Sequence, residues 1–181
     1  MTSDQKQKLD DVAEELFEYV DEVKIIKDLF DALPVKAGIA SPYLNFRDAL
    51  FHYKKMREAA LNGDNSGFIQ QYACIEEHLN RGLKDFSIHL CSNFYIRIIY
   101  EMIYSRSKSV NGDNRPKLRN IYHSIKNIII EIRLEGQSLR HFNDHRNVWL
   151  PKLVDSIKTF DDLLGEYPSL KPLYNRLGTK I

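Results

Sequence analysis

Residues 9–33, LDDVAEELFEYVDEVKIIKDLFDAL, repeat an apolar side chain at alternating steps of three and four. The repeat is carried by Leu9, Val12, Leu16, Tyr19, Val23, Ile26, Phe30 and Leu33. With Ser3 or Asp4 as N-cap and Pro34 as the stop, this spacing predicts one helix of about 30 residues, about 45 Å long. An apolar stripe of that length needs an equally long partner helix, in this chain or in a second copy.

Two further helices are predicted in the next part of the chain. Residues 42–61 lie between Ser41-Pro42, a good helix start, and Asn62-Gly63, a typical helix end. The following stretch begins near Gly67 and keeps helical spacing through Phe86. Residues 91–93, Cys-Ser-Asn, are either a break or a kink, so the stretch 67–108 is one helix or two.

The second half of the chain is also predicted to be helical. A polar loop at 105–117 precedes a helix over 118–132, and Pro151 opens a last helix that ends at Leu164. Residues 166–181 contain two prolines and are predicted to be extended and packed on the bundle. The predicted fold is therefore all-α: one domain, 1–165, built as a bundle of about five to six helices with long antiparallel helices.

Composition excludes several classes of protein. The chain has 181 residues, a mean hydropathy of −0.42 and no apolar run long enough for a membrane helix. Its first residues lack the apolar core of a signal peptide, so we expect a cytoplasmic protein. Two cysteines are too few for a disulfide scaffold or a zinc finger. His141 and His145 stand four apart beside Asp144, but no third ligand has a convincing spacing, so we expect neither metal nor cofactor.

The net charge of +1 conceals an uneven distribution. Residues 1–34 hold ten acids and four lysines, whereas residues 97–152 hold eleven Lys or Arg and five acids. Either the two regions neutralise each other, or the basic region faces an anionic partner. In the second case the expected contacts with an RNA backbone are Arg106, Lys108, Arg115, Lys117, Arg119 and Arg146. The alternative is that the loop bearing most of them is only a solvated turn.

One motif suggests phosphate chemistry. Residues 140–145, Arg-His-Phe-Asn-Asp-His, fit the pattern Arg-x4-His with a polar residue after the arginine. In an all-α chain of long helices this resembles the HEPN superfamily, helical domains of bacterial toxins and defence systems that include many metal-independent ribonucleases. The resemblance implies that Arg140 holds the scissile phosphate and that His145 is the general acid/base on the RNA 2′-hydroxyl. It also implies an active site assembled across a homodimer.

A second match to the same pattern is discounted. Arg47 and His52 also fit Arg-x4-His, but they lie in a predicted regular helix, where a separation of five places side chains on poorly matched faces. Among the aromatic residues, Phe94, Tyr95, Tyr100 and Tyr104 are expected to pack helix on helix, and Trp149 is expected to fill the core.

Two functional hypotheses follow. The first is a HEPN-like protein that binds or cleaves RNA with Arg140 and His145. The alternative is a non-catalytic interaction module that binds a partner helix or a second copy through the heptad at 9–33.

Overall fold

The computed structural model describes residues 1–31, 41–135 and 145–179, and all the secondary structure in these ranges is helical. None of the described helices is both long enough and apolar enough to cross a bilayer. The elements are α1 (Ser3–Asp31), α2 (Ser41–Leu61), α3 (Asn65–Leu90), η1 (Cys91–Tyr95), α4 (Ile96–Tyr104), α5 (Asn114–Glu135), η2 (His145–Trp149), α7 (Leu150–Glu166), η3 (Pro168–Leu170) and α8 (Lys171–Gly178). The predicted all-α class is confirmed.

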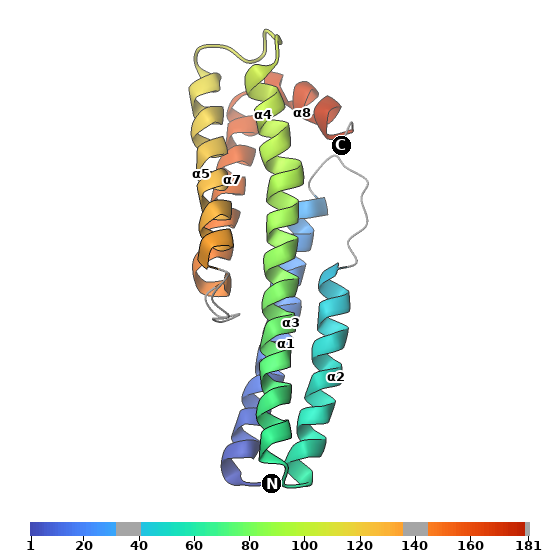
Figure 1. Cartoon of the computed structure of the whole chain (residues 1–181). Coiled ribbons are helices and arrows are strands. Elements are labelled where there is room, and N and C mark those ends of the chain that lie inside the picture. Colours follow the sequence, from blue (N-terminus) through green and yellow to red (C-terminus); the bar gives the residue numbers. More distant parts are fainter. Residues whose placement is uncertain (32–40, 136–144, 180–181) are drawn as a thin grey trace.

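One continuous rod, made of α3, η1 and α4, runs nearly the full length of the molecule (Figure 1). It begins where Asp64 accepts a hydrogen bond from the backbone N–H of Gly67 at 2.9 Å, and Gly63, with φ of 70°, ends the preceding turn. At 1.5 Å per residue the rod is about 60 Å long. The question left open at residues 91–93 is thereby answered: the helix does not break there.

The helix passes residues 91–95 through a π-helical turn, η1. The backbone N–H of Ile96 donates to the carbonyl of Cys91, five residues earlier, instead of four. Leu90 and Ile96 on either side have ordinary α-helical torsion angles. The turn therefore widens the helix locally and changes the register between its exposed and buried faces without ending it.

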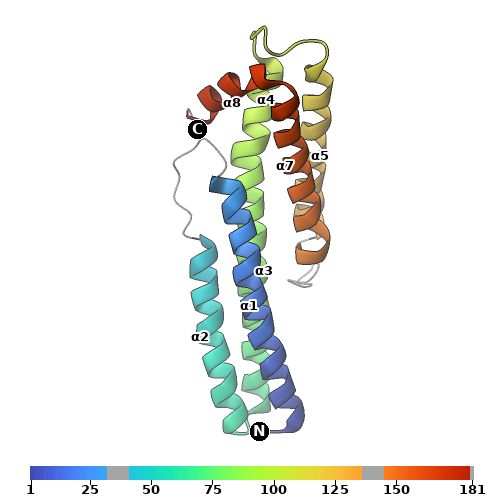
Figure 2. The same cartoon turned by 180° about the vertical axis from the view of Figure 1, so that it is seen from behind.

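The lower half of the rod is covered by α1 and α2, which lie beside α3 in both views (Figures 1 and 2). The described heptad side chains of α1 are buried against α2 and α3: Leu9, Val12, Leu16, Tyr19, Val23 and Ile26. The hydroxyl of Tyr19 donates to the carbonyl of Pro42 at 3.0 Å, and its oxygen would lie 2.0 Å from a Cβ at position 82. Glycine at position 82 therefore permits this close approach. The long partner that the heptad requires is in the same chain.

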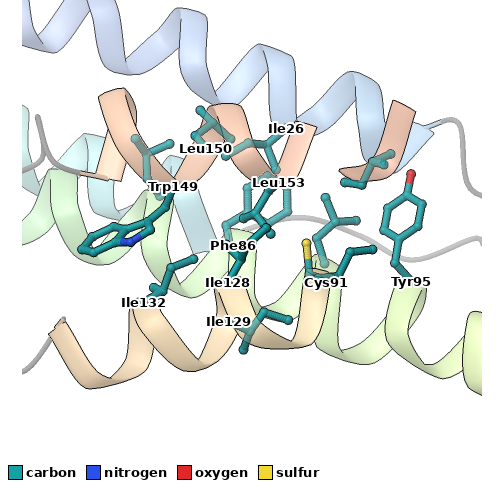
Figure 3. Close-up of a cluster of buried hydrophobic side chains, with 14 of the residues drawn as sticks. Ile26, Phe86, Cys91, Tyr95, Ile128, Ile129, Ile132, Trp149, Leu150 and Leu153 are labelled. Atoms are coloured by element: carbon teal, nitrogen blue, oxygen red, sulfur yellow. The ribbon is translucent and has the colours of Figure 1, made fainter. Parts of the chain in front are cut away.

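The upper half of the rod is covered by α5 and α7, with α8 across its top (Figure 1). The helices of the lower and upper halves meet in one cluster of buried side chains, in which Ile26 of α1, Phe86 of α3 and Leu153 of α7 converge (Figure 3). Trp149 is 6% exposed in this cluster, which confirms its expected role as a core residue. Higher up, Phe160 makes edge contacts with Tyr95 and Tyr174 and fastens α7 to the rod and to α8.

Two segment boundaries differ from the predictions. Helix α5 begins at Asn114, inside the loop predicted for 105–117, because the side chain of Asn111 accepts the backbone N–H groups of Asp113 and Asn114. Residues 166–181 are not extended as predicted: η3 and α8 occupy 168–178. Both prolines of this segment lie in a first helical turn, where the missing N–H costs nothing.

The two cysteines should differ in reactivity. Burial raises the pKa of the Cys91 thiol to about 12, whereas Cys74 is only partly buried. Because the thiolate is the reactive form, a disulfide reagent at pH 8 should modify Cys74 in the native protein and Cys91 only after unfolding. Native Cys74→Ser should be inert, and Cys91→Ser should react as the unmodified chain does. Rapid labelling of native Cys74→Ser would contradict the burial of Cys91.

Candidate functional site

The predicted catalytic pair falls at the edge of the described residues. Arg140 lies outside them, and of His145 and Arg146 only the backbone, in η2, is described. The elements on both sides of the motif are anchored, since Ile132 near the end of α5 and Trp149 at the end of η2 are both buried in the cluster of Figure 3. The roles of Arg140 and His145 stay predictions.

The basic loop before α5 has an ordered backbone. Asn114 is fully buried: its amide nitrogen donates to the carbonyl of Ser109 at 2.8 Å, and its side-chain oxygen accepts from the backbone N–H of Asn111. Arg115 donates from Nη2 to the carbonyl of Val110 at 3.1 Å. Because Val110 is buried, the loop is held at its centre. Arg115 is therefore engaged in holding the loop rather than directed at an external phosphate.

The other predicted RNA contacts divide into two groups. Lys117 is paired with Glu166 at 2.6 Å and lies 5.0 Å from the ring centre of Tyr167, and hydrogen bonding to Glu166 raises the pKa of Lys117. Arg106, Lys108 and Arg119 are exposed, and the described part of the chain provides no carboxylate within ion-pair distance of them. These three remain available to an anionic partner.

The four aromatic residues expected to pack between helices differ in their burial. Phe94 and Tyr95 are buried, as predicted. Tyr104 is 65% exposed and its ring lies against Tyr100 of the same helix, so the prediction that it packs between helices is wrong. Tyr100 is 46% exposed, but its ring contacts Tyr122 of α5, so it packs against the neighbouring helix only in part. Their position on the outward face of α4 follows the π-helical turn, which pattern reading did not foresee.

The exposed tyrosines form a cluster with α5. The ring centres of Tyr100 and Tyr104 are 4.5 Å apart, and Tyr100 lies 6.1 Å from Tyr122 of α5. Lys126 Nζ is 5.8 Å from the centre of the Tyr122 ring, and Arg119 stands three residues earlier on the same helix. We call Tyr100, Tyr104, Arg119, Tyr122 and Lys126 the α4–α5 face. It combines exposed rings with cations on one side of the molecule.

A polar cleft lies beside the π-helical turn. His89, Ser92, Asn93, Phe94 and Arg97 line a volume of about 320 Å³. Asn93 Nδ2 is 2.8 Å from His89 Nδ1, and the His89 ring contacts the edge of Phe94. Sequence reasoning missed this cleft because the altered register of η1 decides which side chains share a face. The Cys-Ser-Asn interruption at 91–93 was the only signal of it.

A histidine pair joins α2 to α3. The rings of His52 and His78 stack with centres 5.2 Å apart. His52 Nδ1 lies 2.7 Å from the side-chain oxygen of Gln71, and His78 Nδ1 lies 3.4 Å from that of Asn45. An amide oxygen can only accept, so each Nδ1 bears the proton in these contacts.

The environment of this pair lowers the pKa of His78, first by burial and then by the positive charge of His52, while Asp48 opposes the shift. Arg47 pairs with Asp48 at 2.7 Å, whereas His52 stacks on His78. The two members of the discounted Arg-x4-His match therefore have different partners.

The outer surface of α1 exposes apolar residues that do not belong to the heptad. Phe17 is 76% exposed, and a groove of about 240 Å³ between α1 and α2 is lined by Val20, Tyr43 and Phe46, with Lys24 and Lys27 also on its wall. Since the described heptad positions are buried within the chain, a partner of α1 would contact this groove instead. The interaction-module hypothesis stays a prediction.

Comparison with protein-family models, curated proteins and solved structures found no match to this chain. Within residues 1–31, 41–135 and 145–179, no three His, Cys, Asp or Glu side chains are grouped so as to hold a metal ion.

The histidine pair should make stability depend on pH. Because the pKa of His78 is below its ordinary value of 6.5 in the folded chain, the unfolded chain binds a proton first as the pH falls. Unfolding free energy should therefore decrease as the pH drops through 6.5 and stop decreasing, for this group, below the lowered pKa. Urea unfolding at pH 7.5 and 5.0 should show a smaller loss for His78→Gln than for the unmodified chain.

The neighbouring histidine provides the matched control. His52→Gln removes the positive charge that lowers the pKa of His78, so NMR titration should find the His78 pKa closer to 6.5 in that variant. Equal pH dependence of the unmodified chain and His78→Gln would contradict the assignment.

Proposed function

We propose that this protein binds RNA through its α4–α5 face and the adjacent basic loop. The observation that carries the proposal is the gathering of exposed tyrosine rings with cations on one side of α4 and α5. Helix α5 itself contains five Lys or Arg and two acids. Cations that neutralise phosphates release counterions, which supplies most of the affinity for a nucleic-acid backbone.

The geometry narrows the predicted set of contact residues. Arg106, Lys108 and Arg119 are proposed to contact phosphates, and Lys126 joins them from the α4–α5 face. Lys117 and Arg115 are not included, because an ion pair with Glu166 and a hydrogen bond to the loop already engage them. The proposed interface is therefore smaller than the sequence suggested and lies at the upper end of the molecule.

The resemblance to HEPN proteins extends the proposal to cleavage. Arginine stays charged and offers two parallel donors to phosphate oxygens, and histidine changes protonation near neutral pH. In the proposed reaction Arg140 would hold the scissile phosphate and His145 would move the 2′-hydroxyl proton. A bacterial toxin or defence setting, and a homodimer that completes the active site, belong to the same proposal.

Reversing charge on α5 should weaken RNA binding. With a short labelled RNA in fluorescence anisotropy, Arg119→Glu/Lys126→Glu should lose about tenfold or more in affinity and show a shallower dependence on salt. The matched control is Lys54→Glu/Arg57→Glu, which makes the same charge change at exposed positions of α2, far from α5 (Figure 1). Equal losses in both variants would indicate that only net charge matters and would contradict a defined interface.

Cleavage should depend on Arg140 and His145 and not on metal. In EDTA, Arg140→Ala and His145→Ala should each slow cleavage of a structured RNA by about a hundredfold or more. The first change removes the charge that holds the scissile phosphate, and the second removes the general acid/base. His123→Ala, an exposed histidine of α5 outside the motif, is the control and should cleave normally. Cleavage that survives both motif substitutions, or its absence with every RNA tried, would refute the catalytic proposal while leaving binding to stand.

A further inference from the structure

We infer that the tyrosine cluster Tyr100, Tyr104 and Tyr122 is a stacking platform for unpaired bases, with Arg97 as the adjoining phosphate contact. The inference rests on the proposed RNA binding and specifies its substrate class. The protein would select single-stranded RNA over duplex RNA.

The rings support stacking because they are grouped: Tyr100 and Tyr104 are exposed, and the partly buried Tyr122 adjoins Tyr100. Single exposed apolar residues are ordinary on protein surfaces, but a contiguous exposed cluster signals a binding site. Tyr100 contacts rings on both sides, Tyr104 within α4 and Tyr122 across on α5, with centres 4.5 and 6.1 Å away. A tyrosine side chain has only two torsion angles, so little conformational freedom is lost when a base stacks on the cluster.

The polar cleft supplies the phosphate contact. Arg97 is exposed and lies three residues before Tyr100, a rise of about 4.5 Å along the helix. Arg97 lines the cleft together with His89 and Asn93, whose side chains contact each other. Its guanidinium can donate two parallel hydrogen bonds to phosphate oxygens. The described residues thus place a phosphate donor one helical turn below the platform.

The π-helical turn explains why these groups share one side of the rod. The wide turn at Cys91–Tyr95 shifts the register of α4 relative to α3. Beyond it, Ile98, Ile99, Met102 and Ile103 are buried, while Arg97, Tyr100, Glu101 and Tyr104 are exposed. The same local geometry therefore buries the apolar pairs of α4 and directs its arginine and tyrosines outward.

Stacking on the tyrosines selects single strands for a simple physical reason. The bases of a duplex are already paired and stacked on each other, so their faces are not accessible to a protein ring. Unpaired bases expose both faces, and every base has an aromatic face, so the platform would tolerate most sequences. The cations of α5 would contact the phosphates of single-stranded and duplex RNA alike, so they would not select one over the other.

Matched RNAs and variants test the inference. Fluorescence anisotropy measures the affinity of each protein for one labelled single-stranded RNA and for the duplex that contains this strand. The proteins compared are the unmodified chain, Tyr100→Leu/Tyr104→Leu, Arg97→Gln and the control Tyr43→Leu, which changes an exposed tyrosine of α2. Leucine keeps the helix and its apolar volume, and circular dichroism verifies the fold. The tyrosine variant should bind the single strand about tenfold more weakly, with duplex binding and the salt slope unchanged. Arg97→Gln should lower the salt slope by about 0.7.

The outcomes separate this inference from the proposed function. If charge reversal on α5 weakens binding but the tyrosine variant does not, the platform is wrong and RNA binding stands. If the unmodified chain binds single strand and duplex equally, and the tyrosine variant weakens neither, single-strand selection is refuted. If the unmodified chain binds no RNA at all, both the proposed function and the platform are overturned.

Discussion

The structure depends on the burial of one very long helix. The rod from Asn65 to Tyr104 is about 60 Å long, and no single neighbouring helix covers it. Helices α1 and α2 cover its lower half, and α5 and α7 cover its upper half (Figure 2). Both groups meet at a small apolar pocket of about 10 Å³ lined by Ile26, Leu90 and Leu153. At the centre of the rod, the burial of apolar side chains from both groups of helices joins the two halves into one fold.

The spacing of the buried residues does not match the 3.6-residue period of an α-helix, and this mismatch explains the π-helical turn within the rod. The buried residues come in adjacent pairs that recur every four residues: Gly82 and Leu83, Phe86 and Ser87, Leu90 and Cys91, Phe94 and Tyr95, Ile98 and Ile99, Met102 and Ile103. In an α-helix of 3.6 residues per turn, such a stripe drifts around the helix by about 40° at each repeat. A turn with more residues per revolution, such as η1, cancels part of this drift and keeps the later pairs against α5 and α7. The exposed tyrosines of α4 are the other consequence of the same correction.

Electrostatics in this protein shows why counting charges does not locate an interface. The loop and the start of α5 contain several basic residues close together in sequence. Yet Arg115 holds the loop and Lys117 pairs with Glu166 from α7, 49 residues away. Glu166 becomes a neighbour of Lys117 only when α5 and α7 pack together, whereas the partner of Arg115 is the carbonyl of Val110 in the adjoining loop. Arg106, Lys108 and Arg119 keep their exposure because the described chain brings no carboxylate to them.

Local signals in the sequence determined most of the fold. The heptad of residues 9–33 specified a long helix and its buried face, and Pro42, Asn62-Gly63 and Gly67 marked boundaries that the structure confirms to within a few residues. Capping and apolar spacing act between residues a few positions apart, so a linear reading captures them. The sequence does not predict the C-terminal helix α8, because proline usually interrupts a helix, whereas both prolines here occupy first turns.

Only the tertiary structure decided which face of each helix is available. It stacked His52 on His78, removed Arg115 and Lys117 from the candidate interface, and exposed Tyr100 and Tyr104 beside Tyr122. Each of these outcomes depends on a residue from a different helix, on the conformation of the loop before α5, or on the changed register after η1. Sequence spacing defines a stripe on one helix, whereas exposure and pairing depend on what packs against that stripe, and packing is a property of the whole chain.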